Sequence, residues 1–91
     1  MSRAARDEGK TLLVRASSPK GLLWEGRAQS VSSLNSQGPF DLLPEHAHFI
    51  SLIERQPIVI VKEGGEEETL IFQSAVIRLF DDVVNIYADI Q

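Results

Sequence analysis

The sequence predicts a small all-β domain, either a sandwich or a small barrel. Short runs rich in β-branched residues recur along the chain, and turn signals separate them at about the 8–12-residue spacing typical of such folds. No long helical pattern lies between the runs, which argues against a parallel sheet with crossover helices. The 91 residues suffice for one hydrophobic core, so we expect a single domain.

The composition excludes several function classes. Apolar residues make up 43% of the chain and charged residues 24%, as in ordinary globular domains. The formal net charge of −4 argues against nucleic acid and anionic membrane surfaces as partners, because both attract clustered Lys and Arg. The chain has no cysteine, which excludes disulfides and thiolate metal sites. No apolar run approaches the roughly 20 residues of a membrane span, so we expect no direct membrane insertion.

The chain divides into a short polar segment and one domain. Residues 1–10 have no apolar centre, so they do not form a secretory signal, and we expect them to be flexible. Residues 11–91 carry all the strand patterns and are predicted to form the domain.

Three extended segments are predicted in the first part of the domain. Thr11 to Ala16 is short and apolar, and a turn containing Pro and Gly follows at Ser17–Gly21. Leu22 to Gly26 is a brief extended piece. Arg27 to Leu34 alternates without a clean apolar face, which favours an edge or twisted strand over a central one.

The middle of the chain contains a second turn and an ambiguous segment. The turn at Asn35–Pro39 precedes a short extended piece at Phe40–Leu43, which Pro44 ends. The apolar spacing then fits either an amphipathic helix over Glu45–Glu54 or a strand over His48–Ile53, and we favour the strand.

The last third of the chain gives clearer patterns, because its apolar runs are β-branched. Paired glycines predict a hairpin turn at Glu63–Glu67, in which they supply the positive φ values of a primed turn. Asp81 and Asp82 turn the chain before its final strand. The four strands expected here are Pro57–Lys62, Glu68–Phe72, Val76–Phe80 and Val83–Ala88.

The sequence contains no motif for catalysis or nucleotide binding. It has no Gly-rich phosphate loop and no marked Ser/His/Asp set, so we expect no catalytic residue and no cofactor. His46 and His48 would share a metal ion on one face of a strand if Asp41 or Glu45 joined them, but surface histidines after a proline turn are the simpler interpretation. We therefore expect no metal site.

The order of several motifs is similar to that of a known family. Residues 18–31 read S-P-K-G-L-L-W-E-G-R-A-Q-S-V, and residues 38–48 read G-P-F-D-L-L-P-E-H-A-H, where L-P-x-H-A after G-x-F is the most specific part. On these motifs the stretch from Leu12 to Ile90 resembles the N-terminal β-domain of the ε subunit of F-type ATP synthases, called δ in mitochondria. Four further segments follow in the family's order: Ile58–Lys62, Glu63–Glu66, Gln73–Val76 and Val84–Asp89.

This resemblance implies a fold, a role and a set of partners. The fold is a flattened antiparallel β-sandwich of about ten short strands. The role is that of a non-catalytic subunit in the central stalk of the rotor, linking the γ subunit to the c-ring during ion-gradient-driven ATP synthesis. The implied location is cytoplasmic and peripheral to the inner membrane through the complex. No small-molecule substrate is implied.

The family's loop that lies near the c-ring corresponds to Gln37, Gly38, Pro39, Phe40 and His46. Asp41 and Glu45 stand within it at positions where the family usually has Gly, which allows a different loop backbone here. His48 replaces the family's usual Pro.

The resemblance covers the family's β-domain and leaves one alternative function open. The sequence ends at Gln91 without the family's C-terminal helical hairpin. The alternative is therefore a free-standing β-sandwich interaction module that has lost the ATP synthase role.

Overall fold

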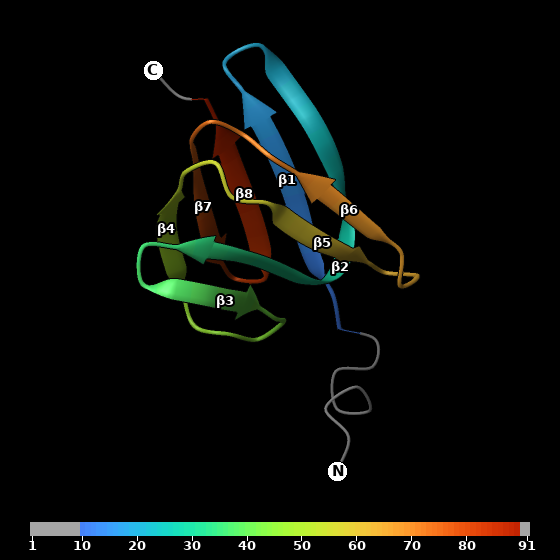
Figure 1. Cartoon of the computed structure of the whole chain (residues 1–91). Coiled ribbons are helices and arrows are strands. Elements are labelled where there is room, and N and C mark those ends of the chain that lie inside the picture. Colours follow the sequence, from blue (N-terminus) through green and yellow to red (C-terminus); the bar gives the residue numbers. More distant parts are fainter. Residues whose placement is uncertain (1–9, 90–91) are drawn as a thin grey trace.

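The computed structural model describes residues 10–89 and confirms the all-β fold class (Figure 1). Of the expected flexible segment, only Lys10 lies within the described residues. Within this range no helix has the length and apolar character needed to cross a membrane. The eight strands are β1 (Leu12–Ser18), β2 (Gly21–Asn35), β3 (Gly38–Leu42), β4 (Phe49–Ile53), β5 (Ile58–Lys62), β6 (Glu67–Leu70), β7 (Ala75–Phe80) and β8 (Val83–Ala88).

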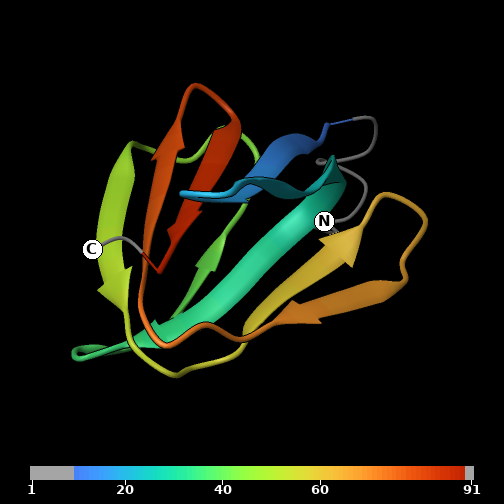
Figure 2. The same cartoon turned by 90° about the horizontal axis from the view of Figure 1, so that it is seen from above.

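The long strand β2 joins the two layers of the sandwich. The strands hydrogen-bond in the order β4-β7-β8-β1-β2-β5-β6, and β3 also pairs with β2. The first half of β2 pairs with β1, and its second half pairs with β3 on one side and β5 on the other. One layer therefore contains β4, β7, β8, β1 and the start of β2, and the other contains β3, the end of β2, β5 and β6 (Figures 1 and 2).

The number and direction of the strands differ in detail from the ten antiparallel strands implied by the resemblance. Leu22–Gly26 and Arg27–Leu34, expected as separate segments, form the single strand β2, which is one reason that the described residues contain fewer strands. The pair β1–β8 is parallel, with Leu13 opposite Val83, whereas the other strand pairs of the described region are antiparallel. This parallel pairing gives β1 a neighbour on the side that β2 leaves open.

Of the edge or twisted strand expected over Arg27–Leu34, the edge alternative is wrong, because this part of β2 pairs on both sides. A β-bulge explains the misleading pattern. The ladder between β2 and β5 shifts register between Ala28 and Ser30. Ala28 is buried before this shift, whereas Val31 and Ser33 are buried after it, so the inward positions lose their two-residue period. The Ser33 hydroxyl donates a hydrogen bond of 3.0 Å to the carbonyl oxygen of Pro57, which satisfies this buried polar group.

The ambiguous segment after the Pro44 turn is a strand, as favoured, and the helix over Glu45–Glu54 is wrong. β4 places Ile53 in the core and leaves Ile50 and Leu52 exposed, which is the alternation of a half-buried strand. Among the strands of residues 10–89, β4 pairs only with β7 and is an edge of the sheet.

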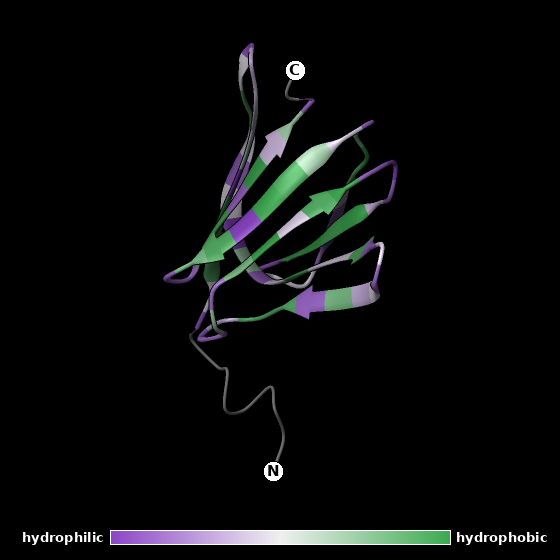
Figure 3. Ribbon diagram, turned by 90° about the vertical axis from the view of Figure 1, so that its left-hand side faces the viewer, coloured by the Kyte–Doolittle hydropathy of each residue, from purple (hydrophilic) through white to green (hydrophobic). Residues whose placement is uncertain are grey.

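The core lies between the two layers and consists of the inward-facing apolar side chains. Hydrophobic residues concentrate in the strands, whereas the turns are hydrophilic (Figure 3). Trp24, Phe40, Phe49, Leu70 and Phe72 are partly buried and pack around this cluster. Its buried members are Leu12, Val14, Ala16, Ala28, Val31, Leu42, Ile53, Ile58, Ile60, Ala75, Ile77, Leu79, Val84 and Ile86.

The hairpin turns differ from expectation in their type. At the glycine pair only Gly65 has a positive φ, 98°, and the Lys62 N–H donates to the Glu66 carbonyl oxygen at 2.7 Å. This geometry fits a turn followed by one left-handed residue, so the primed turn predicted there is wrong. The primed turn lies between β7 and β8, where Asp81 and Asp82 have φ values of 53° and 62°.

Candidate docking loop

The five residues expected near a rotor partner extend from the turn before β3, along β3, to the loop that follows it (Figure 1). Gln37 is in the β2–β3 turn and is exposed. Gly38, Pro39 and Phe40 belong to β3, and His46 is exposed in the loop between β3 and β4. We call residues 37–48 the docking loop.

The structure separates the two ends of this loop. Gln37 precedes β3 and His46 follows it, and a five-residue strand spans roughly 13 Å between its first and last Cα atoms. Phe40 points towards the core instead of the solvent, since its ring lies 4.8 Å from the ring of Phe49. Of these five residues, the ones with exposed side chains are therefore Gln37 and Pro39 near one end and His46 at the other.

β3 is an edge strand, and Pro39 suits this position. β3 pairs only with β2, so its other side carries no strand of the described chain. Proline lacks an N–H donor, and edge strands tolerate it for that reason. An edge with a missing donor is a poor template for unspecific strand pairing.

The part of the docking loop that contains His46 is a tight turn closed by backbone and side chain. The His46 N–H donates to the Leu43 carbonyl oxygen at 3.3 Å, and the Leu43 N–H donates to His46 Nδ1 at 3.3 Å. Pro44 and Glu45 occupy the two central positions, and Glu45 has a φ of 67°. This is the geometry of a type II turn, which places Pro at its second position and normally Gly at its third.

Glu45 therefore keeps a left-handed backbone without being glycine. Such a conformation costs a residue with a Cβ about 1–2 kcal/mol. Two contacts from elsewhere hold it: the Glu45 N–H donates to Asp82 Oδ1 at 2.7 Å, and Lys10 Nζ lies 2.6 Å from Glu45 Oε2. The hydrogen bond from Lys10 holds the pKa of the Glu45 carboxyl below its usual range, and the same bond raises the pKa of Lys10.

Asp41, at the other family glycine position, needs no unusual backbone. It lies within β3 and has no positive φ. Its Oδ1 accepts a 2.6 Å hydrogen bond from the hydroxyl of Ser32, its partner across the β2–β3 ladder. The substitution at position 41 thus leaves a regular strand, and only position 45 places a non-glycine residue in the left-handed region.

The two histidines do not form a shared site. His46 Nδ1 is occupied by the Leu43 N–H, whereas the His48 ring lies 4.3 Å from the ring of Phe80. Both precede β4, so the common strand face on which a metal pair would depend is absent. Among residues 10–89 no group of three or more His, Cys, Asp or Glu side chains could hold a metal ion.

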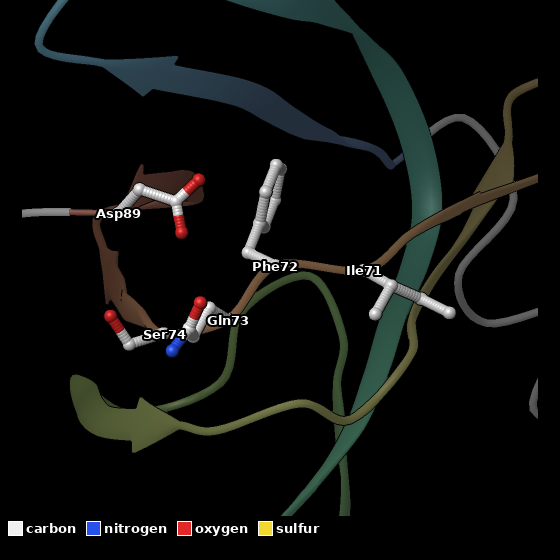
Figure 4. A pocket seen from close by; sticks show the side chains of 5 residues that line it. All are labelled: Ile71, Phe72, Gln73, Ser74 and Asp89. Carbon is white, nitrogen blue, oxygen red and sulfur yellow. The ribbon is translucent and has the colours of Figure 1, made fainter.

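One hollow of the described surface is open and poor in reactive groups. This hollow of about 480 Å³ lies where the segment before β7 meets the end of β8 (Figure 4). Asp89 and Phe72 project into it from opposite sides, and the Asp89 N–H donates to the Ser74 carbonyl oxygen at 2.7 Å. Its lining contains one carboxylate and one hydroxyl but no histidine, lysine or cysteine to act as their base: Ile71, Phe72, Gln73, Ser74 and Asp89.

The structure also reveals a partly apolar surface that the sequence patterns did not predict. Ile50 and Leu52 of β4 are 67% and 54% exposed, and Phe80 of the neighbouring strand β7 is 46% exposed. The ladder sets Ile50 opposite Arg78, whose guanidinium lies 5.2 Å from the centre of the Phe80 ring. The signal was visible in the segment F-I-S-L-I, because both of its faces carry large apolar residues.

The chain matches the sequence model of the family described as ATP synthase, Delta/Epsilon chain, beta-sandwich domain over residues 11–90. It is 28% identical to the ATP synthase epsilon chain of a Sulfurovum species over 71 residues, which are 78% of this chain and 56% of that relative. It is 33% identical to the ATP synthase epsilon chain of a Nitratiruptor species over 61 residues, 67% of this chain and 47% of that relative. The chain thus spans about half the length of these curated relatives.

Solved structures show the same fold. A chain in the cryo-EM structure of the Euglena gracilis mitochondrial ATP synthase, OSCP/F1/c-ring, superposes with a TM-score of 0.78 at 14% identity, covering 86% of this chain and 50% of that one. A chain in the Tetrahymena thermophila mitochondrial ATP synthase central stalk/c-ring gives a TM-score of 0.68 at 8% identity, covering 85% and 62%.

Proposed function

Because the chain belongs to the family of ATP synthase delta/epsilon chain β-sandwich domains, we propose that it is an ε-like subunit of the central stalk of an F-type ATP synthase. In this role it links the γ subunit to the c-ring and performs no chemistry itself. It lies on the cytoplasmic side, peripheral to the inner membrane through the complex.

The observation that carries this proposal is the family match over residues 11–90, which is most of the 91-residue chain. The relatives named above are epsilon chains, and the structural neighbours come from assemblies that contain a c-ring. A role in docking also agrees with the hollow between the segment before β7 and the end of β8, whose lining has no set of groups suited to catalysis.

We propose that the docking loop is the c-ring-facing surface. Gln37, Gly38, Pro39, Phe40 and His46 correspond to the family's motif residues there. Gln37, Pro39 and His46 are exposed and free to make contacts, whereas Phe40 supports the loop from inside through Phe49.

A binding assay with the γ subunit and the c-ring of the source organism tests the proposal. We expect the purified chain to bind γ, and the γ complex to bind detergent-solubilised c-ring. The double variant Gln37→Ala/His46→Ala should weaken c-ring binding and leave γ binding unchanged. Lys20→Ala is the matched control, because Lys20 is exposed in the β1–β2 turn at the opposite end of the sandwich. A wild-type chain that binds neither partner contradicts the central-stalk role and favours a free-standing module.

A further inference from the structure

The turn at Leu43–His46 depends on a residue type that does not favour it. Its third position, Glu45, has a φ of 67°, where glycine fits without strain. The turn places His46, whose backbone N–H and Nδ1 both bond to Leu43. Any group that holds Glu45 in the left-handed region therefore also fixes where His46 lies.

Asp82 makes the contact that holds Glu45. Its Oδ1 accepts the Glu45 N–H at 2.7 Å, a charge-assisted bond across 37 residues of sequence. Asp82 is itself fixed in the primed β7–β8 turn, and its backbone carbonyl oxygen accepts the N–H of Leu13 at 3.0 Å. The acceptor thus comes from the β7–β8 hairpin, which is bonded to β1. The turn of this hairpin lies in the lower part of Figure 1.

Lys10 adds a second, weaker hold. Its ammonium lies 2.6 Å from Glu45 Oε2, but both side chains are more than half exposed, so the pair is screened by solvent. Lys10 therefore restrains the side chain of Glu45, whereas Asp82 binds its backbone N–H.

We propose that Asp82 is a positioning residue for the docking loop: its carboxylate takes over the role that glycine has at position 45 in the family and fixes His46 for binding. The contact that this loop makes with a partner rests on the proposed function. The stabilisation of the turn by the Asp82 carboxylate does not depend on that function, and a separate experiment measures it.

Amide hydrogen exchange of Glu45 in the full chain, followed by NMR, measures this hold. We expect exchange to become faster by roughly tenfold in Asp82→Ala. Asp82→Asn keeps an acceptor oxygen and should restore most of the protection. Asp81→Ala is the control, because Asp81 has a positive φ in the same turn but makes no side-chain hydrogen bond in the described structure. Unchanged exchange in Asp82→Ala, or equal acceleration in Asp81→Ala, overturns the proposal.

A second variant separates loop positioning from general loss of stability. Glu45→Gly adopts the turn without strain, so Asp82→Ala should perturb the amide resonance of His46 several-fold less in the Glu45→Gly background than in the wild type. An equal perturbation in both backgrounds also overturns the proposal.

Binding to the c-ring forms the last arm. Where wild type binds, Asp82→Ala should weaken binding several-fold, whereas Asp82→Asn and Asp81→Ala should bind as wild type does. If wild type fails to bind while the exchange results hold, the proposed function fails and the positioning of the loop by Asp82 stands. If Asp82→Ala loses protection but binds normally, the loop's position does not govern docking and the positioning role is refuted.

Discussion

The six-membered ring of Trp24 lies over Gly26, two residues further along β2, and a Cβ added to Gly26 would be only 2.9 Å from Cη2 of the indole. Both residues face the inner side of the first layer, because Trp24 is opposite Ala16 and Gly26 is opposite Val14 in the ladder. Glycine is needed here for space and not for its backbone freedom.

Gly26→Ala should therefore displace Trp24 and lower the free energy of unfolding by about 1–3 kcal/mol. Trp24 is the single tryptophan, so its fluorescence reports the displacement directly as a shifted emission maximum. Gly64→Ala is the control, since the new Cβ would meet only the mobile carboxylate of Glu66 at 3.3 Å. A Gly26→Ala protein with unchanged emission and stability would contradict this packing.

Ile77 and Ile50 lie on neighbouring strands but on opposite faces. Ile77 is fully buried, whereas Ile50 is 67% exposed. We expect Ile77→Ala to lower the free energy of unfolding by about 2–5 kcal/mol, because it leaves a cavity in the core. Ile50→Ala should change it by no more than about 0.5 kcal/mol. Urea denaturation of both variants checks the contrast, and equal losses would show that the assignment of the two faces is wrong.

Asp81 suits the primed β7–β8 turn, but it is not the residue that adopts this backbone most easily. Asparagine adopts positive φ more readily, so Asp81→Asn should raise the free energy of unfolding by about 0.5 kcal/mol. Asp81→Val, a β-branched residue at a φ of 53°, should lower it by about 1–2 kcal/mol. Thermal unfolding of the two variants ranks them, and the reverse order would exclude this turn type.

The pair Lys10–Glu45 predicts a pH dependence with a defined sign. The pKa of Glu45 is lowered in the folded state by the hydrogen bond from Lys10, so its contribution to stability is present at neutral pH and is lost as the pH falls through the folded-state value. The pKa of Lys10 is raised, so its contribution is lost only as the pH rises through the alkaline range.

An NMR titration of the Glu45 carboxyl carbon tests this pair. Lys10→Gln should raise the pKa of Glu45 towards its ordinary value, and added salt should reduce the difference between the two proteins. Lys20→Gln, far from the docking loop, should leave the titration of Glu45 unchanged. If the pKa of Glu45 does not change in Lys10→Gln, the ion pair between Lys10 and Glu45 does not form in solution.

Some features of the fold could be predicted from the sequence, and others could not. The β-branched run from Ile58 to Lys62 and the Pro and Gly signals of the turns were enough to predict an all-β domain. The bulge after Ala28 was hidden, because a register shift depends on which strand pairs with β2 and leaves no mark in local composition. The bond from Glu45 to Asp82 was hidden for the same reason, since the sheet topology alone brings the two loops together.

The docking loop was located by its motif, and its conformation was not. Glycine positions replaced by Asp41 and Glu45 suggested an altered backbone. The structure shows that one replacement is accommodated in a regular strand and the other in a left-handed turn held from outside. A replaced glycine can keep the left-handed backbone only if a distant group, such as the Asp82 carboxylate, is available to hold it. Local propensity contains no information on whether such a group is near.

The parallel pairing of β1 with β8 bears on how the chain reaches its folded state. The hairpins β1–β2, β2–β3 and β7–β8 form between neighbours in sequence, but β1 joins β8 only after nearly the whole domain has been synthesised. Closing so long a loop is entropically costly and slows folding. During synthesis one side of the apolar strand β1 therefore stays unpaired until β8, the most distant strand of the described residues, has emerged to cover it.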